Sequence, residues 1–181
     1  MQQAWDVDVE WAPFLLDPSI PPEGRTRAPR TTAETPKSHL EERGERLGLE
    51  FRRGRTFTPN SHLALEAGAF ANEHGTREQQ HEFHKAMFEG HFTTFENLGD
   101  LETLKRLAAG AGLDAEALGA ALEAGTYRAQ VDEEIDWARS VGVTGIPTFV
   151  VNGEYAIVGA HEYEVFEQVM EEVGAKRRET S

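Results

Sequence analysis

The chain contains no cysteine, so it has no disulfide, no thiolate nucleophile and no cysteine-based metal site. No apolar run approaches the ~20 residues that cross a bilayer. The first residues, "MQQAWDVDVEW", lack the positive and apolar regions of a secretory signal. Cations are also few: 18 Lys and Arg stand against 32 Asp and Glu, and the net charge of −14 repels phosphate backbones and anionic membranes. These absences predict a cytoplasmic protein that binds neither nucleic acid nor membrane.

Motifs that would identify common enzymes are missing too. There is no glycine-rich phosphate loop, no nucleophile elbow and no paired-carboxylate motif. His81, His84 and His91 lie on one predicted helix, and the first two could share a face that binds a divalent ion. The spacing HxxH is common, however, and no third ligand is suitably spaced. We therefore expect a solvated helix face and no metal site.

The N-terminal region has the pattern of a strand followed by irregular chain. Residues 6–11, "DVDVEW", alternate strictly between apolar and acidic side chains, which predicts a half-buried strand. We expect Trp11 and Phe14, at the end of that strand, to lie in the core. Residues 25–36 are basic, rich in threonine and interrupted by proline, so we expect a mobile segment there.

The middle of the chain is predicted to be helical. Ser38 and Glu41 form a capping box that opens a short helix. Further helices are expected to begin after Pro59 and at Thr76, Asp100, Asp114 and Thr126. Their spacing predicts these buried residues: Leu63, Ala67, Phe70, Ala71, Phe83, Met87, Phe88, Val131, Ile135 and Ala138. The aromatic residues Phe88, Phe92 and Phe95 are expected to pack between two domains.

The C-terminal region has the pattern of a hairpin and a helix. Thr148–Val151 and Glu154–Ala160 flank Asn152-Gly153, the pair that most strongly indicates a type I′ hairpin turn. A last helix begins near Glu162. A single N-terminal strand cannot satisfy the edges of a distant hairpin. The pattern therefore predicts either a small, incomplete sheet or a segment missing before residue 1.

Three stretches resemble one known family. "VEWAPFLLDPSIPPEG" is similar to the second strand and following loop of DsbA-like proteins. "FTPNSHLALEAGAFANEHG" and "KAMFEGHFTTFENLGDLETL" resemble the signatures of the helical domain inserted in that family. "ARSVGVTGIPTFVVNGEYAIVGA" resembles its cis-proline segment. The chain is identified as a member of the DsbA-like thioredoxin-fold family, in the FrnE-type branch related to 2-hydroxychromene-2-carboxylate isomerases.

The resemblance implies an α/β protein with a thioredoxin-like fold, an inserted all-helical domain, and its first strand and first helix missing. Residues 1–56 would form the N-terminal part of the thioredoxin-like domain and a connecting helix. Residues 57–127 would form the helical insertion, and residues 128–181 the C-terminal part with the cis-proline hairpin and the last helix. The family's CxxC motif has no counterpart in the sequence, so no catalytic residue can be named.

The resemblance also implies where substrate binds. Ile146 and Pro147 would face the substrate chain, with the peptide bond between them cis, flanked by Gly145 and Thr148. From the residues alone, a trans proline at the start of an edge strand is the favoured interpretation of Pro147, and the resemblance reverses it. His62 belongs to a signature of the helical domain that faces the cleft. It would line a substrate pocket there or form a structural hydrogen bond to the preceding loop.

The implied activity is cytoplasmic thiol–disulfide oxidoreduction on a protein or peptide substrate, without a cofactor. Without cysteine the chain is expected to be inactive in that reaction, as an N-terminally truncated protein. Two alternatives stay open: a non-catalytic module for peptide binding or assembly, and a glutathione-dependent isomerase or transferase relative. Unpaired sheet edges in a monomer favour aggregation. This favours truncation, or else a homodimer that supplies strands in trans.

Overall fold

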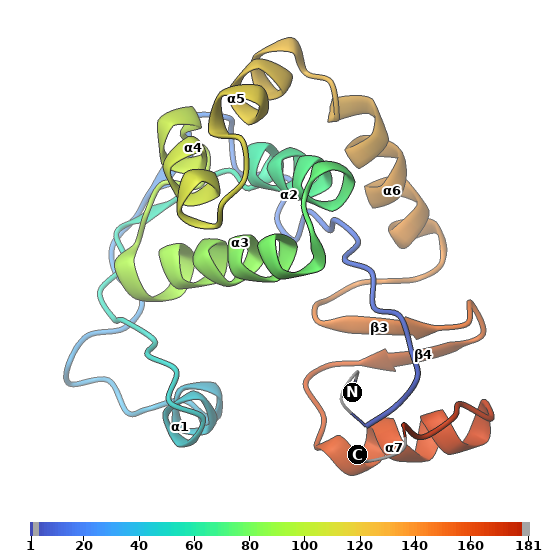
Figure 1. Cartoon of the computed structure of the whole chain (residues 1–181). Coiled ribbons are helices and arrows are strands. Elements are labelled where there is room, and N and C mark those ends of the chain that lie inside the picture. Colours follow the sequence, from blue (N-terminus) through green and yellow to red (C-terminus); the bar gives the residue numbers. More distant parts are fainter. Residues whose placement is uncertain (2–3, 179–181) are drawn as a thin grey trace.

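The computed structural model describes residue 1 and residues 4–178. Within these residues the chain forms helices α1–α7, the π-helix η1 and two separate two-stranded sheets (Figure 1). The helices are α1 His39–Arg46, α2 His62–His74, α3 Arg77–Glu89, η1 Gly90–Thr94, α4 Leu101–Gly110, α5 Ala115–Ala124, α6 Arg128–Ser140 and α7 Tyr163–Glu172. The strands are β1 Arg25–Thr26, β2 Phe57–Thr58, β3 Thr148–Val151 and β4 Tyr155–Val158.

The main hydrophobic core lies between helices α2 to α6. Side chains from all five helices form one buried cluster, whose largest fully buried members include Phe83, Leu104 and Leu118. Of the ten residues predicted to be buried on these helices, Phe88 is the clear exception, with 51% of its surface exposed. Phe88 follows Met87 at the edge of the buried stripe of α3, and its ring reaches the surface. In the described residues no helix is long and apolar enough to span a membrane.

The predicted helix caps are present in the structure. Ser38 and Glu41 form the capping box of α1, and Thr76 forms a second capping box on α3 with Gln79. The side chains of Asp100 and Asp114 accept hydrogen bonds from the first turns of α4 and α5. Local sequence therefore sets where these helices begin. The helix that was expected from Thr126 begins two residues later, at Arg128.

The C-terminal hairpin packs on α7. β3 and β4 pair antiparallel, and the connecting residues Asn152 and Gly153 have φ angles of 52° and 73°, as a type I′ turn requires. The ring of Phe149 meets that of Phe166 of α7 edge to face at 4.8 Å. Figure 1 shows α6 descending from the helical group to this hairpin, with α7 on its far side.

The prediction of a strand at residues 6–11 is wrong. The backbone there forms no ladder: Trp5 makes an isolated bridge with Arg177, and Asp6 N–H donates to Lys176 O at 2.8 Å. Trp5 is 1% exposed and lies under the Arg177 guanidinium, 4.5 Å from the ring centre. Trp11, expected in the core, is 47% exposed, and Phe14 is half-buried. An alternating pattern becomes a strand only when it pairs with a partner strand, and no described strand pairs with these residues.

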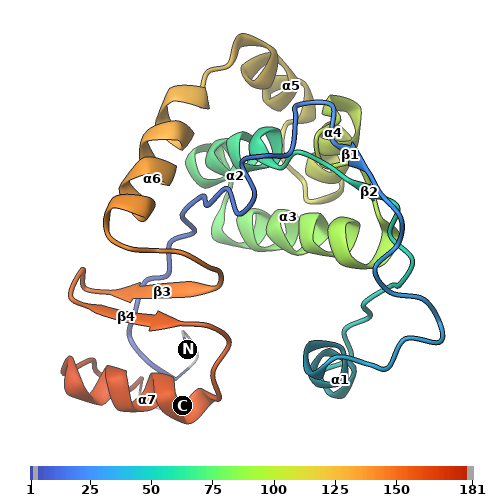
Figure 2. The ribbon, with the colours of Figure 1, turned by 180° about the vertical axis from the view of Figure 1, so that it is seen from behind.

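A second small sheet connects α1 to the helical group. β1 pairs with β2 antiparallel, and Arg27 N–H continues the pairing by donating to Thr56 O at 2.7 Å. Figure 2 shows the two segments running together from the helical group towards α1, which stands apart from the other helices. β1 thus lies in the basic stretch that was predicted to be mobile.

Candidate functional site

The segment Gly145–Thr148 joins α6 to β3. Gly145 is half-buried, whereas Ile146 is 54% exposed and Pro147 is exposed. The Ile146–Pro147 peptide bond is cis, the geometry that the resemblance implies. The Thr148 hydroxyl donates to Gly145 O at 2.7 Å, and Gly159 N–H donates to Pro147 O at 2.8 Å. These bonds fix the segment while leaving the Ile146 side chain open to solvent.

The end of α6 sets the direction in which this segment leaves the helix. Gly142 has a φ angle of +85°, which a side chain would disfavour, and Val143 N–H donates back to Ala138 O at 3.0 Å. This is the bonding of a Schellman cap. Val131, Ile135 and Ala138 of α6 are all buried. The segment that carries Ile146 is therefore anchored to the helical group through α6.

One edge of β3 has no partner among the described strands. In the antiparallel ladder, Phe149 faces Ile157 and Val151 faces Tyr155. Because Pro147 O accepts from Gly159, these pairs are the ones that exchange hydrogen bonds, since bonded and non-bonded pairs alternate. The backbone groups of Thr148 and Val150 therefore point away from β4. They are free to pair with an additional strand.

Only one face of the hairpin contacts α7. Side chains alternate between the faces, so Phe149 and Ile157 share the face that packs on α7, and Ile157 is buried. The opposite face carries Val150 and Val158, which are 42% and 58% exposed. Ile146, in the segment before β3, is exposed as well. Exposed apolar side chains therefore lie on β3, on β4 and on the segment that leads into β3.

His62 lies in a different part of the molecule. It is the first residue of α2, and its ring nitrogens contact two carboxylates: Nδ1 lies 3.0 Å from Glu66 Oε1 and Nε2 lies 2.9 Å from Asp132 Oδ1. Asp132 is in the first two turns of α6, whereas Gly145–Thr148 follows the other end of that helix, about 12 Å along its axis for eight residues. The side chain of His62 thus connects α2 to α6 rather than to the preceding loop.

Glu66 is the most buried charged residue described. It is 1% exposed, and its Oε2 atom is buried without a hydrogen-bond partner. Arg128 Nε lies 3.8 Å from Oε1, so His62 provides the closer contact. Sequence reasoning missed Glu66 because a glutamate on an apolar helix face gives no signal of a partner elsewhere in the chain. A buried carboxyl group of this kind is costly unless it is paired.

Histidines of α3 and η1 lie close to aromatic rings. Among the described residues, no three His, Cys, Asp or Glu side chains are grouped so as to hold a metal ion. His84 stacks on Trp11 with ring centres 4.9 Å apart, and burial, followed by the charge of His81, lowers its pKa. His91 packs edge to face on Phe92 at 4.7 Å. These two half-buried histidines therefore take part in aromatic packing.

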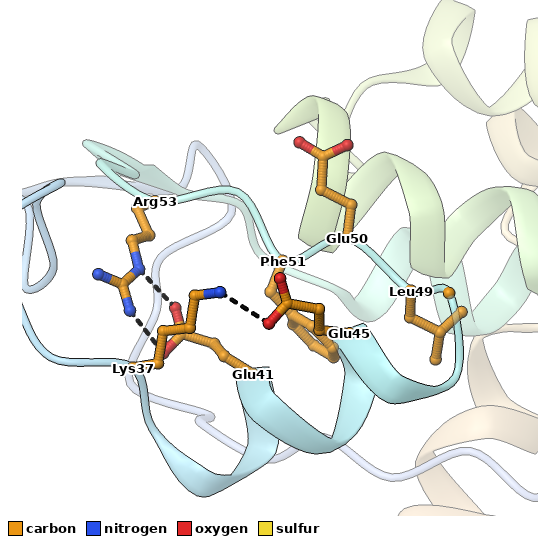
Figure 3. A pocket seen from close by; sticks show the side chains of 8 residues that line it. Lys37, Glu41, Glu45, Leu49, Glu50, Phe51 and Arg53 are labelled. Carbon is orange, nitrogen blue, oxygen red and sulfur yellow. Dashed lines mark hydrogen bonds and ion pairs between the residues drawn. The ribbon is translucent and has the colours of Figure 1, made fainter.

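A pocket of about 340 Å³ lies against α1 (Figure 3). Figure 3 shows Arg53 facing Glu41 and Lys37 facing Glu45, and both pairs have their closest atoms 2.7 Å apart. Hydrogen bonds from Arg53 and then Ser38 lower the pKa of Glu41 to about 2. Ion pairs thus neutralise most charges of this pocket. None of its lining residues belongs to the hairpin, so we do not place the functional site there.

Comparison with known proteins finds a family model and two relatives that match the chain. The model of the DSBA-like thioredoxin domain matches residues 1–171. The uncharacterized protein YwbO of Bacillus subtilis (strain 168) is 30% identical over 174 residues, which cover 95% of this chain and 85% of that protein. The crystal structure of a probable DsbA oxidoreductase, SCO1869 from Streptomyces coelicolor, is 29% identical with a TM-score of 0.63. That match covers 78% of this chain and 61% of the Streptomyces chain, so the chain spans about three fifths of that relative.

Proposed function

Because the chain belongs to the DSBA-like thioredoxin domain family and has a thioredoxin-like fold, we propose that it provides the substrate-binding part of a thiol–disulfide oxidoreductase. The substrate is a protein or peptide in extended conformation. It contacts Gly145, Ile146, Pro147 and Thr148. We also assign the chain to the FrnE-type branch of the family and place its action in the cytoplasm.

The observation that carries this proposal is the exposure of Ile146 at the start of β3. A side chain of this size gains about 1.5–3 kcal/mol when it is fully buried, so an exposed isoleucine on a fixed segment is a favourable contact for an apolar substrate side chain. Val150 and Val158 are further exposed apolar side chains on the hairpin that follows. Extended peptides commonly bind in this way, with backbone pairing for affinity and side-chain contacts for specificity.

The chemistry requires thiols that these 181 residues do not contain. Disulfide exchange begins when a thiolate attacks one sulfur of the disulfide, and the other sulfur leaves as a thiolate. We propose that the thiol pair lies on a strand-and-helix segment outside these residues. That strand pairs with the free edge of β3, where the backbone groups of Thr148 and Val150 point outward. The thiols would then stand next to Ile146 and the bound substrate.

The proposal predicts that the purified 181-residue chain does not reduce disulfides. In the insulin turbidity assay with dithiothreitol, the rate with the protein is expected to equal the rate with buffer alone, because the chain carries no thiol that could relay electrons from dithiothreitol to insulin. A thioredoxin with an intact CxxC motif serves as the positive control. Turnover above the buffer rate would show that the chain does not depend on thiols from elsewhere.

Binding can be tested separately from turnover. Ile146→Asp is expected to weaken binding of iodoacetamide-alkylated insulin B chain about tenfold or more, because a charge replaces the apolar contact at the centre of the site. Val141→Asp is the matched control, since Val141 and Ile146 are both 54% exposed. Fluorescence anisotropy of labelled B chain measures both affinities. Equal losses in the two variants would reject Ile146 as a substrate contact.

A further inference from the structure

Three arginines gather where the β1–β2 sheet meets the end of η1. Arg27 directly follows β1, and Arg52 and Arg55 precede β2. The guanidinium carbons of Arg55 and Arg52 lie 4.4 Å and 5.2 Å from the centre of the Phe95 ring. Burial, and next the positive charge of Arg27, lowers the pKa of Arg55. The three cations therefore share one small region of the surface, which we call the arginine cluster.

The arginine cluster forms no ion pair in the described part of the chain. None of the ion pairs there involves Arg27, Arg52 or Arg55. The Nε atom of Arg27 is buried and has no hydrogen-bond partner. This is unexpected in a chain with 32 acidic residues and 18 basic ones. Like charges held together and an unsatisfied buried donor both cost free energy, and a bound anion would remove both costs.

The backbone around the cluster is held in place. Phe95, which supports two of the arginines, has a φ angle of +60°, in the left-handed region that a residue with a side chain rarely adopts. It follows a π-helical turn, a feature that is frequent at functional sites. Arg52 N–H donates to Phe92 O at 3.0 Å, and Arg27 N–H donates to Thr56 O at 2.7 Å. The cluster is therefore presented by a fixed scaffold.

We propose that Arg27, Arg52 and Arg55 bind a dianionic oxyanion, either free phosphate or the phosphate group of a small phosphomonoester. Guanidinium groups are planar donors that match phosphate oxygens two at a time. A dianion also neutralises more of the cluster's charge than a single carboxylate does. The site lies at β1, β2 and η1 rather than at the hairpin, and it does not depend on the proposed oxidoreductase function.

Calorimetric titration of the 181-residue chain with sodium phosphate tests the proposal, with sodium acetate and sodium chloride at matched ionic strength as references. We expect saturable phosphate binding that Arg55→Gln weakens about tenfold or more, because it removes charge-assisted hydrogen bonds. The control Arg30→Gln changes the net charge equally at an exposed arginine outside the cluster, and it should keep the wild-type affinity. Titration with glycerol 3-phosphate distinguishes the two sources: tighter binding than phosphate indicates a phosphomonoester, and equal or weaker binding indicates the free anion.

Phosphate binding no stronger than acetate or chloride binding, or an equal loss in Arg30→Gln, would overturn the proposal. A second readout is independent of affinity. Bound phosphate should raise the pKa of His91, which Arg55 helps to lower, and NMR titration of the imidazole measures this shift. If Arg55→Gln does not fold, as judged by circular dichroism, Arg27→Gln replaces it with the same expected loss.

Discussion

Replacing His62 with alanine is expected to lower the free energy of unfolding by about 3 kcal/mol, because it removes the main partner of a buried carboxyl group. Glu66 is 1% exposed, and its closest contact is His62 Nδ1 at 3.0 Å. Losing one partner of a buried pair typically costs about 3–5 kcal/mol. Arg128 stays near Oε1 at 3.8 Å, which places the expected value at the lower end. Urea denaturation of the wild type and variant measures the difference.

Two further variants separate the buried contact from the exposed one. Asp132→Asn removes the second partner of His62, but the Asp132 side chain is 60% exposed, so the expected cost is below about 1 kcal/mol. Adding Glu66→Met to His62→Ala removes the unpaired carboxyl group and should restore more than half of the lost stability. A His62→Ala protein within about 1 kcal/mol of the wild type would contradict the assignment of His62 as the partner that stabilises Glu66.

The second large effect is a loss of folding stability at acidic pH. Burial, and next the charge of Arg55, lowers the pKa of His91 to about 4, from 6.5 for a free histidine. Between those two pH values the unfolded chain binds a proton that the folded chain does not. The contribution of His91 to stability is therefore complete above pH 6.5 and is lost as the pH falls towards 4. The loss amounts to about 3 kcal/mol at ~1.36 kcal/mol per pKa unit.

The measurement is a comparison of the wild type with His91→Gln. Glutamine does not titrate, so the variant should lose about 3 kcal/mol less stability than the wild type between pH 6.5 and pH 4. The other acidic groups titrate in both proteins, so their effects on stability cancel when the two pH profiles are subtracted. Arg55→Gln should raise the pKa of His91, because it removes the second cause of the shift, whereas Arg30→Gln should not. Identical pH profiles for the wild type and His91→Gln would show that His91 does not carry this acid sensitivity.

Local signals in the sequence were reliable where one residue determines one local conformation. Asn152-Gly153 predicted a tight turn because both residues must have positive φ, and they do. Ser38 and Thr76 predicted helix starts because each can accept a backbone hydrogen bond three residues on, and each forms a capping box. The identification of the family, from motifs spread along the chain, agrees with the family model and with the solved relative.

Contacts between distant residues could not be read from the sequence. The alternation at residues 6–11 is a strand pattern, but a strand also needs a partner, which the described residues do not supply. Glu66 and Asp132 meet His62 from four and seventy residues away. The arginine cluster depends on the left-handed conformation of Phe95. The sequence does not indicate this conformation, because it is typical of glycine and not of phenylalanine. Each of these features arises from tertiary packing.

The Schellman cap at the end of α6 couples the position of the hairpin to the packing of the helical core. The hairpin continues directly from a helix whose buried residues Val131 and Ile135 belong to the helical core, and Gly142 fixes the exit angle. A small rotation of α6, caused by a change at its buried residues, would therefore move Ile146 without any substitution at Ile146. Under the proposed function, a substitution in the helical core would shift the substrate-contacting segment while leaving its own residues unaltered.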